Sequence, residues 1–272
     1  MGHVGSYPLT CMINLVIDWG NTRLKAGWFA GDQLIEISRY ESIDELLNDS
    51  GVRQAAQPIN RHVLVSSTAQ SAALIGQGLG RLNYTVLVLN GQTPLPIRNG
   101  YGTPQTLGAD RVAAAVGAAA LFPERDCLIL DLGTCLTADL IDREGTFQGG
   151  LISPGLRMRL RAMHEQTARL PLIDWKPDEL TDWPSPTAKN TRDAMLSGVL
   201  NGLLLEMNGL IDQYRHDRPE MVVVLCGGDA SVFESRLKPP IFAMPELVLT
   251  GLNRILRYNV ENLQANTPDV NA

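Results

Sequence analysis

Residues 14–34 read NLVIDWGNTRLKAGWFAGDQL, and residues 127–147 read CLILDLGTCLTADLIDREGTF. Each stretch predicts a buried strand, a tight turn at an Asp-x-Gly sequence, a second strand, another turn and a third strand. Asp18 and Asp131 end the leading strand in the two stretches. We interpret this similarity as an internal duplication of one supersecondary unit.

The length of the chain supports two domains. A chain of 272 residues, 44% of them hydrophobic, has the size at which a single core stops growing. We expect two α/β domains over residues 12–118 and 119–272, each with a mixed sheet opened by a three-strand meander and flanked by helices. Residues 1–11 show no periodic pattern and are expected to form a loose extension.

The charge balance argues against several classes of partner. With 23 Lys and Arg against 29 Asp and Glu, the net charge of -6 provides no positive field for nucleic acid. No run of about 18 uninterrupted apolar residues predicts a membrane span, and no signal-peptide pattern opens the chain. We therefore expect a cytoplasmic protein without nucleic-acid or membrane partners, whose four cysteines are reduced and mostly buried.

The first turn, from Asp18 to Lys25, could bind phosphate. Gly20 allows close approach of a ligand, Asn21 and Thr22 offer donors, and Asp18 could hold a hydrated divalent cation. Lys25 lies within reach of a phosphate. A plain hairpin with a satisfied aspartate is the alternative for this motif taken alone.

The second turn, from Asp131 to Thr137, favours a ligand site. Two such turns from duplicated strands could hold a triphosphate from both sides. The Gly-x-x-x-x-Gly-Lys-Ser/Thr pattern of a P-loop does not occur in the sequence. Gly227-Gly228-Asp229 follows another buried strand and would suit a nucleoside, although a simple strand-to-helix turn is the favoured interpretation of this motif taken alone.

Asp110 and Arg111 begin an Ala-rich segment that predicts a helix. A rigid element would place the carboxylate of Asp110 beside a Gly-rich loop, where it could act as a base. A helix-stabilising aspartate is the alternative. Arg111 could clamp a carboxylate with its planar fork or form a surface ion pair.

Five ordered motifs together resemble the type III pantothenate kinases, within the acetate and sugar kinase, heat-shock chaperone and actin superfamily of ribonuclease H-like folds. The motifs are Asp18-Trp-Gly-Asn-Thr22, Gly108-Ala-Asp-Arg111, Asp131-Leu-Gly-Thr134, Gly149-Gly-Leu-Ile-Ser-Pro-Gly155 and Asn190-Thr191. The resemblance covers about residues 12–258 and implies two ribonuclease H-like domains with a nucleotide cleft between them.

The resemblance also implies a role for each matching residue. The ATP-binding residues would be Asp18, Trp19, Gly20, Asn21, Thr22, Arg23, Leu24, Lys25 and Thr134. The pantothenate-binding residues would be Tyr101, Gly108, Ala109, Asp110, Arg111 and Thr191, with Asp110 as the proton acceptor. Asp18 would position Mg2+, and Asp131 would bind a monovalent cation, K+ or NH4+.

The activity expected from this resemblance is ATP-dependent phosphorylation of the 4′-hydroxyl of pantothenate, the first step of coenzyme A synthesis. The alternative is a non-catalytic, nucleotide-binding regulatory or accessory protein of the same fold. The resemblance further implies a homodimer. Helix 109–121 and the apolar stripe from Leu156 to Leu170 could supply its interface or could equally belong to the core.

Overall fold

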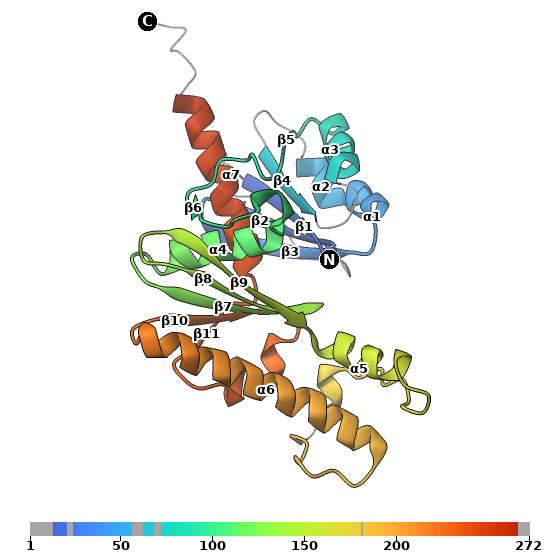
Figure 1. Cartoon of the computed structure of the whole chain (residues 1–272). Coiled ribbons are helices and arrows are strands. Elements are labelled where there is room, and N and C mark those ends of the chain that lie inside the picture. The colour runs from blue at the N-terminus through green and yellow to red at the C-terminus, as the bar shows by residue number, and fades with distance from the viewer. Residues whose placement is uncertain (1–12, 21–23, 56–61, 68–71, 181, 266–272) are drawn as a thin grey trace, which may run out of the picture. The chain divides into compact units, whose positions relative to one another are not determined.

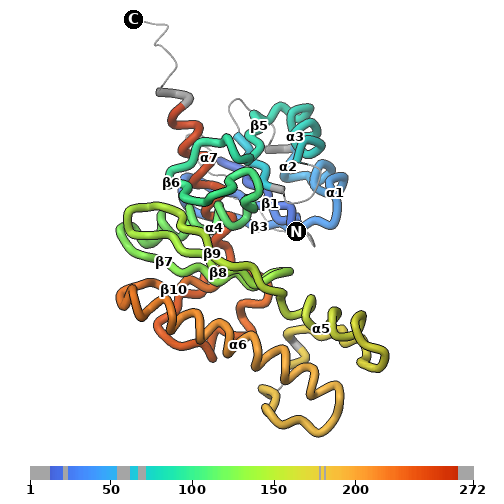
Figure 2. The backbone as a smooth tube through the Cα atoms, in the orientation of Figure 1, coloured from blue at the N-terminus to red at the C-terminus, as the bar shows by residue number. Residues whose placement is uncertain are grey.

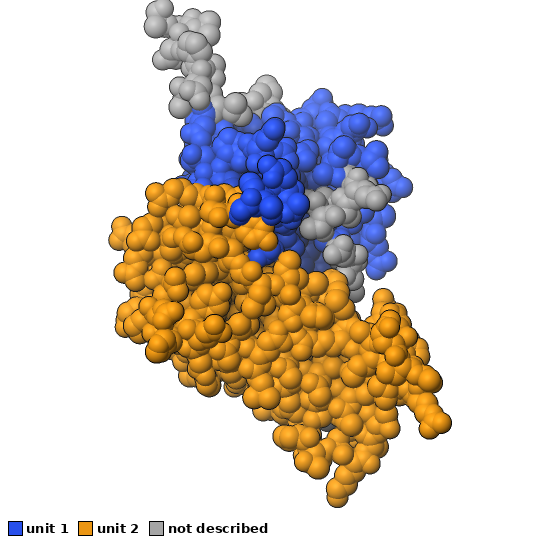
Figure 3. Space-filling view, in the orientation of Figure 1, with its two compact units in different colours: residues 1–97, 102–120, 248–272 blue, residues 98–101, 121–247 orange. Residues whose placement is uncertain are grey.

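The computed structural model describes residues 13–20, 24–55, 62–67, 72–180 and 182–265 (Figure 1). The chain divides into two compact units, which Figure 3 colours separately. Unit 1 comprises residues 1–97, 102–120 and 248–272, and unit 2 comprises residues 98–101 and 121–247. The end of the second segment of unit 1 lies close to the expected division at residue 118, whereas the last helix groups with the first unit.

Unit 1 contains a five-stranded mixed sheet in the order β3-β2-β1-β4-β5. Its strands are β1 (Ile13–Trp19), β2 (Leu24–Ala30), β3 (Gln33–Tyr40), β4 (His62–Ser67) and β5 (Thr85–Val88). The first three strands run antiparallel as a meander, and β4 and β5 continue the sheet in parallel with β1. Gly31, with φ of +59°, and Asp32 form the expected turn between β2 and β3.

Alternating apolar side chains cover both faces of this sheet. Leu15 and Ile17 of β1 belong to a core cluster shared with α1 (Ile43–Asn48), α2 (Ser50–Ala55) and α3 (Ala72–Arg81). Val16 lies in a second cluster with α4 (Ala109–Leu121) and α7 (Leu247–Ala265). Because strand side chains alternate in direction, α4 and α7 pack on the face to which Val16 and Asp18 project.

The two helices on that face cross at small residues. A Cβ at Gly251 of α7 would lie 1.7 Å from the carbonyl oxygen of Ala113 in α4, so only glycine permits this approach. The buried Asn14 of β1 donates a hydrogen bond to Asn253 of α7 at 3.0 Å. Asn253 in turn donates to the carbonyl of Gly31 at 2.8 Å. These contacts explain why the C-terminal helix belongs to unit 1.

Unit 2 repeats the same sheet and extends it at one edge. Its order is β11-β10-β7-β8-β9-β6. The strands are β6 (Arg98–Asn99), β7 (Cys127–Leu132), β8 (Cys135–Ile141), β9 (Thr146–Pro154), β10 (Val222–Cys226) and β11 (Phe242–Ala243). The antiparallel meander β7-β8-β9 and the parallel pair β10 and β11 match β1-β2-β3 and β4-β5 of unit 1. The duplication expected from the sequence is therefore present in the fold. Figure 2 traces the path of the backbone through both units.

Helices α5 (Leu156–Glu165) and α6 (Thr191–Asp217) pack against each other in unit 2. Leu156 and Leu160 are buried in its core, as are Val112 and Val116 of α4 in unit 1. The faces that could have supplied a dimer interface thus belong largely to the intramolecular core. The short 3-10 helices are η1 (Pro104–Thr106), η2 (Pro177–Glu179), η3 (Ala230–Val232) and η4 (Glu234–Arg236).

One helix, α6, is long and apolar enough to cross a membrane by length and composition alone, with a mean hydropathy of 1.4 over its most apolar window. Eight of its residues, among them Leu200, Leu203 and Met207, are buried within unit 2. Burial of this kind is typical of the core helix of a folded domain.

Candidate active site

The first Asp-x-Gly turn follows β1 in unit 1. Asp18 lies one residue before the end of β1, in register with Lys25 of β2 on one side and Ser66 of β4 on the other. Residues opposite one another on neighbouring strands project from the same face of a sheet. A carboxylate, an ammonium group and a hydroxyl therefore form a row across three strands, on the face that α4 and α7 cover.

The other residues of this turn have different surroundings. Leu24 is buried in the core cluster on the opposite face of the sheet, and Trp19 packs against that cluster. A phosphate at this turn would meet the backbone of these residues rather than their side chains. The predicted ATP-binding residues Asn21, Thr22 and Arg23 lie outside the described residues.

Asp110 stands in the first turn of α4, with its carboxylate directed back toward the start of the helix. Its Oδ1 accepts a hydrogen bond from the backbone N–H of Arg111 at 2.8 Å. A Cβ at Gly108 would lie 2.5 Å from the same oxygen, so the glycine makes room for the carboxylate. The partial positive charge at the helix N-terminus also favours a carboxylate there. The motif Gly108 to Arg111 thus fixes the position of one acid group, and Arg111 beside it is buried.

The second Asp-x-Gly turn has the same place in the sheet of unit 2. Asp131 is in register with Thr137 of β8 and with Cys226 of β10. Gly227 follows β10 with φ of +93°, and a Cβ there would lie 2.4 Å from Oδ1 of Asp131. The carboxylate therefore lies directly against the backbone of the glycine pair.

Backbone contacts close the turn at Thr134. The N–H of Gly133 donates to the carbonyl of Cys135 at 2.9 Å, and the N–H of Gly155 donates to the carbonyl of Thr134 at 3.2 Å. A Cβ at Gly155 would lie 2.5 Å from the Thr134 carbonyl oxygen. The last glycine of the Gly149 to Gly155 motif thus supports this turn, while the Thr134 side chain is exposed.

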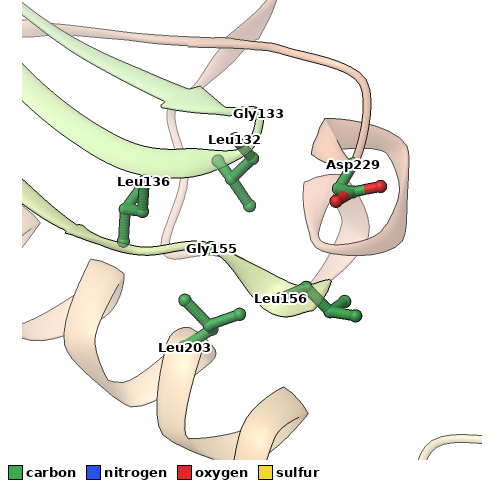
Figure 4. Close-up of a pocket in the computed structure, with 7 residues that line it drawn as sticks. All are labelled: Leu132, Gly133, Leu136, Gly155, Leu156, Leu203 and Asp229. Carbon is green, nitrogen blue, oxygen red and sulfur yellow. The ribbon is translucent and has the colours of Figure 1, made fainter. Parts of the chain in front are cut away.

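An ion pair between the buried Asp229 and the partly exposed Arg157 lies beside the second turn. The backbone N–H of Asp229 donates to the Leu132 carbonyl at 3.0 Å, and its carboxylate accepts from the guanidinium of Arg157 in α5. Burial raises the pKa of Asp229, and the positive charge of Arg157 opposes that rise. Asp229 lines a narrow pocket, shown in Figure 4, with Leu132, Gly133, Leu136, Gly155, Leu156 and Leu203.

The two remaining predicted substrate contacts belong to unit 2. The Tyr101 ring lies 6.0 Å from that of Phe147, measured between centroids, and a Cβ at Gly149 would meet it at 3.2 Å. Thr191 is exposed at the start of α6, directly after Asn190, whose side chain caps the helix by accepting from the Asp193 N–H at 2.9 Å. Both side chains are accessible to a ligand in part or in full.

Oxygen donors suit the ions expected at the two aspartates. In the described part of the chain, no three His, Cys, Asp or Glu side chains gather into a metal cluster. Magnesium that travels with a nucleotide is commonly held by one or two carboxylates and the phosphates. The Asp18 carboxylate beside the Ser66 hydroxyl, whose oxygen is buried and unpaired within the described residues, fits such an ion.

Sequence reasoning missed Ser66 and the partner of Asp229. Of the arginines of α5, Arg161 forms an exposed helical pair with Glu165. Arg157 and Arg159 instead make specific contacts, the latter with Glu206 and with Ser153 at 2.9 Å. The signal in the sequence was an aspartate directly after an apolar strand and a glycine pair, because a carboxylate that is buried at such a place needs a partner.

The comparisons with known proteins identify close relatives. The family model for type III pantothenate kinase matches residues 14–213. A protein of Cytophaga hutchinsonii named type III pantothenate kinase is 43% identical over 249 residues, covering 91% of this chain and 100% of that protein.

Solved structures give the fold. The activator of the 2-hydroxyisocaproyl-CoA dehydratase from Clostridium difficile, with bound ADPNP, has a TM-score of 0.53 and 14% identity, and the match covers 96% of this chain and 100% of that one. A ROK family glucokinase from Streptomyces griseus, with glucose and AMPPNP, has a TM-score of 0.52 and 11% identity over 90% of this chain and 99% of that one. At such identities the likeness concerns the fold alone.

Proposed function

The chain belongs to the type III pantothenate kinase family. On that basis we propose which of its residues bind ATP, pantothenate and ions, and which residue accepts the proton. The chain is a phosphotransferase that uses ATP to phosphorylate pantothenate on its 4′-hydroxyl, in the first step of coenzyme A synthesis. The alternative of a non-catalytic accessory protein is not favoured, since the relatives over nearly the whole chain are named as kinases.

The assignment of the ATP site rests on the repeated position of Asp18 and Asp131. Each aspartate stands at the same place in one of two sheets with the same strand order, and each is followed by a glycine turn. Gly20 and Gly133 leave the backbone accessible to phosphate oxygens. We assign the triphosphate to these two turns, with Lys25 beside Asp18 and the exposed Thr134 as further contacts.

Asp110 is the proposed proton acceptor. Its carboxylate is held by the backbone N–H of Arg111, so it would approach the hydroxyl of the substrate in one orientation. As the hydroxyl oxygen forms its bond to the γ-phosphorus, the bond from that phosphorus to the bridging oxygen breaks and ADP leaves. The hydroxyl proton passes to Asp110. Positioning matters more than basicity here, because phosphoryl transfer passes through a loose transition state.

Arg111, Tyr101 and Thr191 are the proposed substrate contacts. The planar guanidinium of an arginine matches a carboxylate with two parallel hydrogen bonds, and pantothenate carries one carboxylate. The half-buried Tyr101 and the exposed Thr191 hydroxyl offer further hydrogen bonds. Gly108 and Ala109 contribute backbone at the start of α4.

Two ions complete the proposal. Asp18 would hold magnesium, which when bound neutralises the charge of the phosphate oxygens. Asp131 would hold potassium or ammonium beside the backbone of Gly227. The ordinary preference of these ions for oxygen ligands supports both assignments.

We further propose that the enzyme is a homodimer that works in the cytoplasm. Exposed apolar side chains on unit 2 support an interface, since Ile152 of β9 is 62% exposed and Leu205 of α6 is 72% exposed. Light scattering that gives the mass of a single chain would contradict the dimer. The burial of α6 in the core supports a protein without a membrane span.

An assay of purified protein tests the activity and the ions together. ADP release would be followed with ATP, magnesium and potassium, with pantothenate or a panel of sugars and other hydroxy acids as acceptors. We expect turnover that depends on pantothenate and falls when potassium is replaced by sodium. Absence of pantothenate-dependent turnover would contradict the assignment.

A further inference from the structure

Ser66 is one of the buried polar groups that the proposed reaction does not use. It lies in β4 with 0% of its surface exposed. Its hydroxyl oxygen has no hydrogen-bond partner in the described part of the chain. An unpaired buried hydroxyl destabilises a folded protein, so such groups in native structures call for an explanation.

The side chain of Ser66 projects to the face of the sheet that α4 and α7 cover. Leu64 belongs to the core cluster that contains α4 and α7, whereas Val63 and Val65 belong to the cluster on the opposite face. Since side chains alternate along a strand, Ser66 shares its face with Leu64. The hydroxyl is therefore directed to the same side as Asp18, which shares its face with Val16.

Ser66 and Asp18 are direct neighbours across parallel strands. They are in register in the pairing of β1 with β4, and neighbouring strands lie about 4.8 Å apart. Lys25 flanks Asp18 on the other side. The Asp18 carboxylate thus has a cation on one strand and a hydroxyl donor on the other, both on its own face.

The second unit shows that the fold itself does not require a hydroxyl here. The residue in the matching register beside Asp131 is Cys226, which is also buried. A thiol is a weak donor and behaves as a small apolar group in a core. The same sheet position is therefore filled without a hydroxyl in unit 2.

We propose that Ser66 is a positioning residue for Asp18. In the nucleotide-bound enzyme its hydroxyl donates a hydrogen bond to the Asp18 carboxylate and fixes the orientation in which that carboxylate meets magnesium and ATP. This inference rests on the proposed role of Asp18. Hydrogen bonds to a charged acceptor are about twice as strong as neutral ones. The bond to Asp18 in the complex would therefore offset the free-energy cost of burying the Ser66 hydroxyl.

The test compares Ser66→Ala, Ser66→Cys and Ser66→Thr with the wild type. Binding of ADPNP with magnesium is measured by calorimetry, and Tm is measured with and without that complex. We expect Ser66→Ala and Ser66→Cys to bind the complex about ten-fold more weakly, since a hydrogen bond to a charged group is lost. Without nucleotide their Tm should equal or exceed that of the wild type, because an unpaired polar group has been removed. The KM for pantothenate should stay unchanged.

Ser66→Thr keeps the hydroxyl and should restore binding to near the wild-type value; if its extra methyl group prevents folding, the alanine and cysteine variants still decide the question. Tyr40→Phe is the matched control, because it removes a buried hydroxyl from the opposite face of the same sheet and should leave nucleotide binding unchanged.

Wild-type affinity in Ser66→Ala would overturn the inference. So would a fall in Tm without nucleotide that accompanies the weaker binding, since that pair of results describes a structural residue. Absence of pantothenate-dependent turnover in the wild type would instead contradict the proposed function. It would leave the test of Ser66 intact, because the calorimetry does not depend on pantothenate.

Discussion

The Asp229 carboxylate accepts two hydrogen bonds from Nη1 of Arg157, at 3.0 and 3.1 Å, with 4% of the Asp229 side chain and 58% of the Arg157 side chain exposed. The pair links the glycine-pair loop after β10 to the first turn of α5. It lies beside the second Asp-x-Gly turn, so its stability bears on the turn to which we assign ATP.

Arg157→Ala should destabilise the protein in a pH-dependent way. Burial raises the pKa of Asp229 and Arg157 opposes the rise, so the variant should raise that pKa further. A carboxyl group with a raised folded pKa stabilises the fold while protonated and loses this contribution as the pH rises through the folded pKa. We expect a loss of about 1–3 kcal/mol near neutral pH, which shrinks toward pH of about 4.

Urea unfolding across this pH range measures the effect. Arg161→Ala is the control, because its pair with Glu165 is exposed on the same helix and should change stability by less than about 0.5 kcal/mol at every pH. A loss in Arg157→Ala that stays constant with pH would show that the arginine acts through packing alone.

Gly108→Ala should impair catalysis without unfolding the protein. The new Cβ would lie 2.5 Å from Oδ1 of Asp110, and a flexible carboxylate would move away rather than the backbone. A displacement of about 1 Å at a catalytic group can lower the rate about a hundred-fold. We expect a fall of this order in kcat with little change in Tm. Gly102→Ala in the same loop meets no atom within 4 Å and should behave as the wild type.

Asp110→Asn should lower kcat by a factor of about 100 to 10,000, the usual contribution of a positioned base. The amide keeps the shape of the carboxylate, so binding of magnesium and ADPNP should be retained. Steady-state kinetics and calorimetry separate the two effects. A variant with near-wild-type kcat would remove Asp110 from the role of proton acceptor.

Gly227→Ala should damage the second turn. The residue has φ of +93°, and its Cβ would lie 2.4 Å from Asp131 Oδ1 and 2.5 Å from the backbone of Leu132. We expect a loss of stability of at least about 1–3 kcal/mol, together with a loss of turnover. Gly228→Ala, which meets nothing within 4 Å, is the neighbouring control. Equal stability of the two variants in chemical denaturation would contradict the close packing.

Gly251→Ala should separate α4 from α7 in unit 1. With only 1.7 Å between the new Cβ and the Ala113 carbonyl oxygen, the helices must shift, at a cost of about 1–3 kcal/mol or more. Gly198→Ala in α6 is the matched control, since nothing lies within 4 Å and alanine favours a helix interior by roughly 0.5–1 kcal/mol. Thermal unfolding should therefore show opposite signs for the two variants.

Local features of the fold could be predicted from the sequence. The Gly31-Asp32 turn and the two Asp-x-Gly turns followed from strand patterns and turn residues. Ser42 caps α1, since its hydroxyl accepts from the Glu45 N–H at 3.1 Å. Such features depend on residues that are close in the chain, so a single sequence carries them.

Contacts between distant residues could not be predicted. Asn253 reaches the carbonyl of Gly31 across a sequence separation of 222 residues, which assigns the last helix to unit 1. Arg157 is separated from Asp229 by 72 residues. Nothing in the local pattern around either residue names its partner.

The sequence by itself determined the duplicated strand-turn-strand unit and the position of an aspartate at the end of each leading strand, because strand alternation and glycine turns are local properties of the chain. Only the tertiary structure decided which groups surround those aspartates. Strand register placed Ser66 beside Asp18 and Cys226 beside Asp131. The packing of α4 and α7 on the sheet of unit 1 decided which helices cover the face of Asp18 and Ser66. Register and packing arise when segments far apart in the chain bury their apolar faces together, which no local pattern specifies.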